Sequence, residues 1–205
     1  DALNANTEGQ NNIAMGRRTM YFNKQGDDNI TLGREALYFN TIGNNNIAFG
    51  RISLESNIDG NDNIAIGLQS LQRNTSGNFN IGIGKDALKL KTTGNNNLVL
   101  GYNAASNLTS GSNNIILGQN TLAVNTTGNN QLNIGNAIHG DLATRNIGID
   151  VVNPTKKLEV NGTIKAKDIN FTGLVTYATD VDAGIGGLVS GDVYKTAAGE
   201  LRIKL

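Results

Sequence analysis

The sequence predicts an all-β protein, a β-solenoid (β-roll or β-helix) of 17-residue coils followed by a small region of β-hairpins. The first observation behind this prediction is a repeated phrase, clearest as Gly43-Asn44-Asn45-Asn46-Ile47-Ala48-Phe49-Gly50. Its closing glycine recurs with a step of 17 and no slip, at positions 16, 33, 50, 67, 84, 101, 118 and 135. The second is strict apolar alternation before each closing glycine, and the third is turn chemistry after it.

Each coil is expected to contain one short strand just before its closing glycine. The residues one and three positions before that glycine are apolar in every coil, which predicts a strand that buries one face. These pairs are Ile13/Met15, Ile30/Leu32, Ile47/Phe49, Ile64/Ile66, Ile81/Ile83, Leu98/Leu100, Ile115/Leu117 and Leu132/Ile134.

A second inward-facing stretch is expected four residues after the closing glycine, where a large apolar residue usually follows a small one. The apolar residues are Met20, Leu37, Leu54, Leu71, Leu88 and Leu122, and the small ones are Ala36, Ser53, Ser70 and Ala87. Asn and Gly come next and tolerate left-handed backbone angles, so they predict turns. These asparagines are Asn23, Asn40, Asn57, Asn74 and Asn125.

The residues after the opening glycine of the phrase are nearly all asparagine, as in 44–46, 95–97 and 129–130. Coils stacked about 4.8 Å apart place equivalent asparagines above one another, where their amides can form hydrogen-bonded ladders. We therefore interpret them as turn and ladder residues, with a ligand-binding or ice-binding face as the alternative.

Composition narrows the classes of function. The 205 residues carry 17 basic and 17 acidic side chains, so nothing favours nucleic acid or an anionic membrane surface as a partner. The chain has no cysteine, and its short apolar runs predict no membrane insertion. No motif for a cofactor is found. The chain opens partway through a coil, and we expect it to be the C-terminal piece of a longer protein.

A single chain is not expected to bury all of its apolar residues. A 17-residue coil offers about three large apolar side chains, and exposed apolar stripes normally mark an interface. Three chains around a common axis would bury a continuous core and protect the sheet edges. The sequence therefore predicts a parallel homotrimer, with a single narrow solenoid as the alternative.

The period fails after Gly135, which divides the chain into a repeat region (1–137), a transition with a hairpin (138–166) and a C-terminal β tip (167–205). The only histidine, His139, is expected in a loop. Asn161-Gly162 between alternating apolar residues predicts one hairpin. A second is predicted from 193–196 and 200–204 around the turn at 197–199. Asp180 and Asp182 give a weak calcium signal, and a solvated loop is the preferred interpretation.

The repeated phrase resembles the head repeats of trimeric autotransporter adhesins of the YadA type, and more closely the related repeats of phage tail fibres and similar viral fibres. This resemblance covers about residues 1–137. The stretch from Asn146 to Ala166 is similar to a segment that follows the shaft in phage tail fibres, with Asp150 in place of the usual Gly or Thr. The end of the chain also looks like the C-terminal segment of phage structural proteins, which would make Leu205 a natural terminus.

The resemblance implies a structural, host-receptor-binding fibre on an extracellular virion. The expected partners are two further copies of the chain, other tail proteins joined through a preceding segment, and a glycan or protein receptor on the host. Receptor contacts are guessed at Tyr177, Tyr194 and Arg202. Such a fibre acts by multivalent binding and is not an enzyme.

Three alternatives stay open. A bacterial surface adhesin would share the architecture. A polysaccharide-cleaving tailspike needs paired carboxylates, whereas Glu35, Glu55, Asp59 and Asp86 occupy scattered repeat positions. An ice-binding protein would need a flat threonine face. The basic residues after the closing glycine (Arg17, Arg34, Arg51 and Lys85) are interpreted as a solvated face.

Overall fold

The computed structural model describes residues 1–91, 93–166, 193–195 and 201–203, and these residues form strands, turns and no helix. No described segment is therefore a helix able to cross a membrane. The chain separates into two compact units, Asp1–Thr163 and Ile164–Leu205. The strands are β1 (Ile13–Met15), β2 (Ile30–Leu32), β3 (Ile47–Phe49), β4 (Ile64–Ile66), β5 (Ile81–Ile83), β6 (Leu98–Leu100), β7 (Ile115–Leu117), β8 (Gln131–Ile134), β9 (Ile138–Asp141), β10 (Asn146–Ile149), β11 (Leu158–Val160), β12 (Val193–Lys195) and β13 (Leu201–Ile203).

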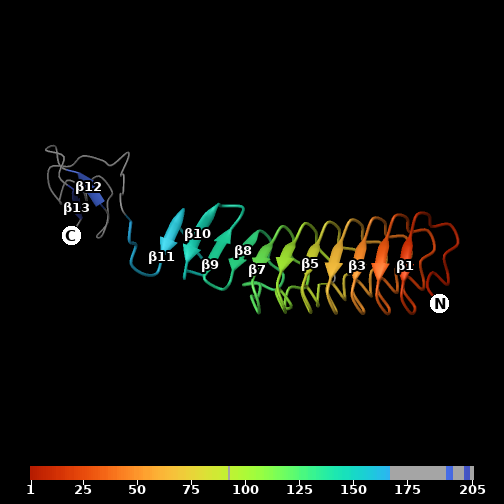
Figure 1. Ribbon diagram of the computed structural model, residues 1–205. Helices are drawn as coiled ribbons and strands as arrows, with labels where there is room; N and C mark the ends of the chain where they lie inside the picture. Colours follow the sequence, from red (N-terminus) through yellow and green to blue (C-terminus); the bar gives the residue numbers. More distant parts are fainter. Residues whose placement is uncertain (92, 167–192, 196–200, 204–205) are drawn as a thin grey trace. The chain divides into compact units, whose positions relative to one another are not determined.

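The first unit is the predicted β-solenoid of 17-residue coils. Strands β1 to β8 stack in sequence order along one axis and pair in parallel (Figure 1). The register confirms the period, since Ile47 pairs with Ile30 on one side and with Ile64 on the other. Backbone hydrogen bonds between coils continue outside the strands, for example from Leu37 N to Ser53 O at 3.0 Å.

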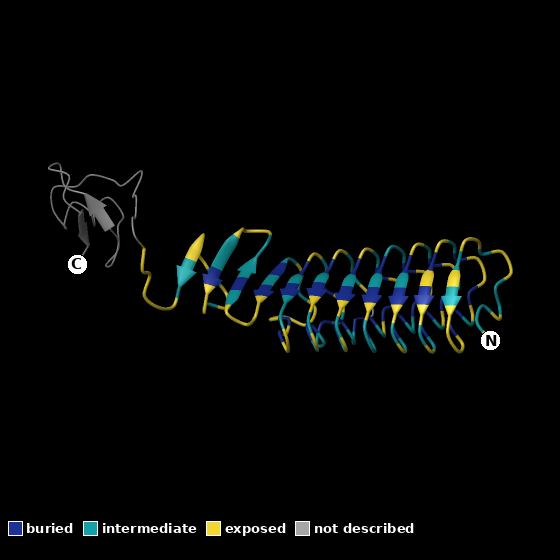
Figure 2. Ribbon diagram, in the orientation of Figure 1, coloured by how far each residue is buried: buried dark blue, intermediate teal, exposed yellow. Residues whose placement is uncertain are grey.

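The inward face of these strands is the opposite of the predicted one. In β2 to β7 the middle residue is buried, whereas the two residues beside it are half-buried or exposed (Figure 2). The interior is narrow: a methyl group added to Gly82 would lie 3.3 Å from Leu71 Cγ. Because the interior space at the strand is small, mostly small residues point inward: Ala14, Thr31, Ala48, Ala65, Gly82, Val99 and Ile116.

The second inward stretch is confirmed in the first coils. Met20, Leu37, Leu54, Leu71 and Leu88 are all fully buried and form the centre of the core with the small strand residues. These five residues have left-handed φ angles of 48° to 52°, a conformation that costs less for side chains without a branch at Cβ.

Leu122 is the exception to that prediction, because it is 43% exposed and Ala123 is buried in its place. Asn107 on the preceding coil explains the shift. Its side chain accepts a hydrogen bond from Ala123 N and donates one to Ala123 O, both at 2.9 Å. The side chain of Asn107 therefore holds the backbone of Ala123 at the interior, and Leu122 turns outward.

The predicted asparagine ladders are confirmed. The inner ladder (Asn12, Asn29, Asn46, Asn63, Asn80, Asn97 and Asn114) ends at Gln131, and each amide bonds the one on the neighbouring coil. A second ladder (Asn6, Asn23, Asn40, Asn57 and Asn74) occupies positions for which the sequence predicted only turns. The middle asparagine of the phrase has the expected turn geometry, with φ of 56° at Asn45.

The sheet continues past the last coil by a different route. β9 turns back antiparallel to β8, β10 pairs antiparallel with β9, and β11 pairs in parallel with β10. The hairpin predicted around Asn161-Gly162 is therefore wrong: Leu158–Val160 adds to the open edge of β10 instead of pairing with the residues after the turn.

The second predicted hairpin is confirmed. β12 and β13 pair antiparallel, with Tyr194 opposite Arg202 in the register.

Candidate binding surfaces

One apolar surface of the solenoid consists of the outward residues of strands β1 to β8. We call it the outer stripe: Ile13, Met15, Ile30, Leu32, Ile47, Phe49, Ile64, Ile66, Ile81, Ile83, Leu98, Leu100, Ile115, Leu117, Leu132 and Ile134. Parallel pairing in register places each of these side chains directly beside its equivalent on the next coil. The stripe is apolar in all eight coils, and in the single chain its side chains are half-buried or exposed. Contiguous apolar surface of this kind normally marks an interface.

A second apolar surface lies on the turn that follows the strand, in the first four coils. Phe22, Lys24, Phe39, Thr41, Ser56, Ile58 and Thr75 line a groove of about 480 Å³, which we call the aromatic groove. The Phe22 and Phe39 rings stack with their planes 3° apart and their centroids 5.7 Å apart. Tyr38 meets Phe39 edge to face at 4.7 Å, which holds the ring in place. The groove was not predicted from the sequence, although Tyr-Phe pairs at 21–22 and 38–39 were a visible signal.

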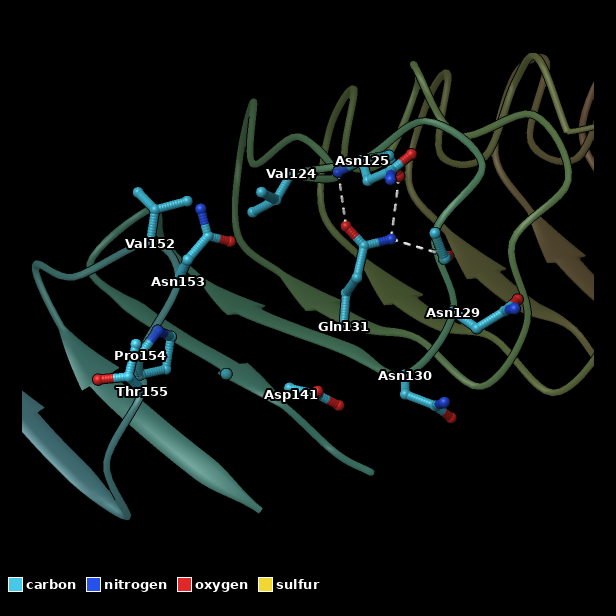
Figure 3. A pocket seen from close by; sticks show the side chains of 12 residues that line it. Val124, Asn125, Asn129, Asn130, Gln131, Asp141, Val152, Asn153, Pro154 and Thr155 are labelled. Atoms are coloured by element: carbon cyan, nitrogen blue, oxygen red, sulfur yellow. Dashed lines mark hydrogen bonds between the residues drawn. The ribbon is translucent and has the colours of Figure 1, made fainter. Parts of the chain in front are cut away.

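A hollow of about 400 Å³ lies where the last coil meets β9 and the loop around Pro154 (Figure 3). Gln131 fills the inner end of this hollow. Its Oε1 accepts a hydrogen bond from Asn125 N at 2.7 Å, and its Nε2 donates to Gly128 O at 2.9 Å. Asp141 accepts a bond from Ala143 N at 2.8 Å. The amide of Gln131 already forms hydrogen bonds with the surrounding backbone. We therefore interpret this hollow as a structural feature of the end of the solenoid and not as a binding site.

Lys91 is the most unusual ionisable residue of the solenoid, and it was not singled out from the sequence. It occupies the position of the second ladder that Asn74 holds one coil earlier, and it is fully buried. Its ammonium donates to Thr93 O and, at 3.2 Å, to Gly111 O, so Asn74 Oδ1 is left buried without a donor. Burial lowers the pKa of Lys91 from 10.5 to about 8, because desolvation disfavours the charged ammonium.

His139 does not lie in a loop, as was expected, but in β9, where it is buried opposite Asn133. Its Nε2 is 3.0 Å from Asn136 O, and its Nδ1 has no hydrogen-bond partner. The inward position of the antiparallel strand explains the burial, which the loss of the 17-residue period concealed.

The acidic residues considered for catalysis remain dispersed. Glu35 pairs with Arg34 at 3.6 Å, Glu55 accepts a bond from Gln72 at 2.7 Å, and Asp86 pairs with Lys89 at 3.2 Å. Within the described residues, no group of three or more His, Asp or Glu side chains could hold a metal ion. Among the basic residues after the closing glycine, Lys85 lies 5.6 Å from the ring of Tyr102.

The guessed receptor contacts lie in the second unit. Tyr177 is outside the described residues, as are Asp180 and Asp182. Tyr194 and Arg202 are cross-strand partners on β12 and β13. Their role in binding stays a prediction.

Comparison with protein-family models, with curated proteins and with solved structures finds no match for this chain. Its function must therefore be inferred from the two surfaces and from the resemblance of the repeats.

Proposed function

We propose that the chain is the shaft of a trimeric attachment fibre, carried by a phage or a phage-like particle and binding the host surface. The observation that carries this proposal is the outer stripe, which is apolar in every coil and half-buried or exposed in the single chain. A partner that runs the full length of the solenoid must offer the same 17-residue period, and another copy of this chain does so.

We propose three copies and not two. A closed threefold arrangement turns three stripes toward one axis, so that each chain contacts both neighbours. The resemblance to trimeric adhesin heads and phage fibres supports the same number. Attachment then gains from three identical sites, which bind a surface more tightly than one site does.

The role proposed is binding and not catalysis, since Glu35, Glu55 and Asp86 each pair with a basic or amide side chain. Release of reducing sugar from host polysaccharide would instead favour a tailspike. A bacterial surface adhesin shares the same architecture. Attachment to bacterial cells favours the fibre, and attachment only to eukaryotic cells or matrix favours the adhesin.

The stripe is tested by substituting one outward residue in the middle of the solenoid. Ile66→Lys places a charge in the proposed interface and is expected to convert the trimer to monomers, measured by sedimentation. Phe79→Lys is the matched control, because Phe79 is 58% exposed and lies outside the stripe. A trimer that tolerates Ile66→Lys as well as Phe79→Lys would contradict the proposed interface.

A further inference from the structure

The aromatic groove contains a column of stacked rings that stops abruptly. Phe22 and Phe39 hold equivalent positions in successive coils, and their rings stack with nearly parallel planes. The next residue at this position is Ser56, which is too small to continue the stack. Ser56 adds no ring to the column, so Phe39 remains 45% exposed, and both residues line the groove.

A second copy of the chain is a poor candidate for covering this groove. Copies that run in register contact the same coil position repeatedly, so their interface must have similar chemistry in every coil. The outer stripe meets that condition. The position of Phe22 and Phe39 does not, because it continues as Ser56, Arg73, Leu90 and Asn107. The groove is thus a local feature of the first four coils.

The size and lining of the groove suit a small ligand. A volume of about 480 Å³ lies within the usual range for ligand pockets, which combine apolar walls with a few polar groups. Thr41 Oγ1 donates to Ile58 O at 3.0 Å and keeps acceptor capacity toward the groove. Ser56 adds a hydroxyl, and Lys24 adds an ammonium that forms no ion pair within the described part of the chain.

These features match the chemistry of a sugar ring. A pyranose has one face of C–H groups, which carry slight positive charge and stack on the negative face of an aromatic ring. Its edge carries hydroxyls that bond groups such as those of Thr41, Ser56 and Lys24.

We propose that the aromatic groove binds a saccharide residue, which stacks on the open face of Phe39 in the space that Ser56 leaves. The inference rests on the proposed attachment function and deepens it, since it places a host-glycan site on the shaft. Three chains would present three such grooves around the fibre.

The test uses the full chain and a defined set of probes: cellotetraose, chitotetraose and sialyllactose, each titrated by calorimetry. At least one probe is expected to bind. Phe39→Ala removes the platform, and Ser56→Phe fills the space by extending the ring column, so each should weaken that binding about tenfold or more. Phe79→Ala removes an exposed ring elsewhere and should leave the binding unchanged.

Ser56→Phe is expected to fold normally, because Phe22 and Phe39 already hold the same position in neighbouring coils. A loss of binding in this variant therefore cannot be attributed to unfolding. Its circular dichroism and molar mass should equal those of the wild type. Failure of all three probes to bind, or equal binding by the two groove variants and the wild type, would overturn the saccharide site. If the trimer still attached to host cells in that case, the proposed function would stand without this site.

Discussion

Replacing Lys91 with asparagine should stabilise the solenoid at neutral pH. Burial in the folded chain lowers the pKa of this lysine from 10.5 to about 8. At about 1.4 kcal/mol per pH unit, keeping the buried ammonium charged costs the folded state about 3 kcal/mol. The asparagine amide of the variant would also supply the donor that Asn74 Oδ1 lacks. Its own oxygen would face Leu108, which cannot donate, and this offsets part of the gain. We expect a net increase of about 2–3 kcal/mol in the free energy of unfolding at pH 7.

The pH dependence follows from the direction of the same shift. Between pH 8 and 10.5 the unfolded chain binds more protons than the folded chain, so the stability of the wild type rises with pH across this window. The gain is complete above pH 10.5 and absent below pH 8. Lys91→Asn should lack this rise, because it removes the titrating group.

Unfolding by guanidinium, followed by circular dichroism at several pH values from neutral to alkaline, measures both effects at one protein concentration. Tyrosines and other lysines titrate in both proteins, so the informative quantity is the difference between wild type and variant. That difference should shrink as pH rises. Parallel curves for the two proteins, or a less stable variant at neutral pH, would refute the reasoning.

Four further substitutions test the backbone and the ladder, each by the midpoint of thermal unfolding at fixed concentration. Gly67→Ala should cost about 3 kcal/mol, since its new methyl group would lie 2.6 Å from Gly84 O, whereas Gly135→Ala, with nothing within 4 Å, should cost about 1 kcal/mol; equal losses would contradict the packing. Asn46→Ala should cost about 3 kcal/mol, because Asn46 is fully buried and bonds Asn29, Gly60 and Asn63 in the inner ladder; a loss below about 1 kcal/mol would argue against the ladder. Ile52→Asn should gain about 1 kcal/mol, because Ile52 is β-branched at a left-handed φ of 51°; an unchanged midpoint would argue against that conformation.

Most of the fold could be predicted from the 17-residue repeat. The position of every strand from β1 to β8 follows from the closing glycines, because one coil of a solenoid must reproduce the next. The direction in which each strand faces did not follow. Alternation shows which residues share a face, and we assigned the large residues to the interior by the usual rule. Next to Leu71 the interior has room only for Gly82 from the strand, whereas Val99 and Ile116 fit inward farther along the solenoid. The large residues that flank these strand positions point outward.

The errors after Gly135 have a common cause. Without a repeat, local turn signals were the only guide, and Asn161-Gly162 is a strong one. Leu158–Val160 pairs with the open edge of β10 instead of forming the local hairpin. A local sequence pattern cannot reveal such a pairing. The burial of His139 was hidden for the same reason.

The candidate surfaces were only partly predictable. An exposed apolar stripe was expected from the small number of apolar residues per coil. The aromatic groove was not, because its shape depends on the stacking of Phe22 on Phe39 and on the gap at Ser56. Lys91 was missed because one lysine in a row of asparagines becomes informative only once the row is known to be buried.

The molar mass of the chain in solution, measured by light scattering before and after brief heating in detergent, tests the proposed fibre most directly. A mass of three chains that survives the detergent is the expected result, since three outer stripes would be buried together along eight coils. A monomer at every concentration would contradict the proposal, because the outer stripe would then remain open to water with no copy of the chain to cover it.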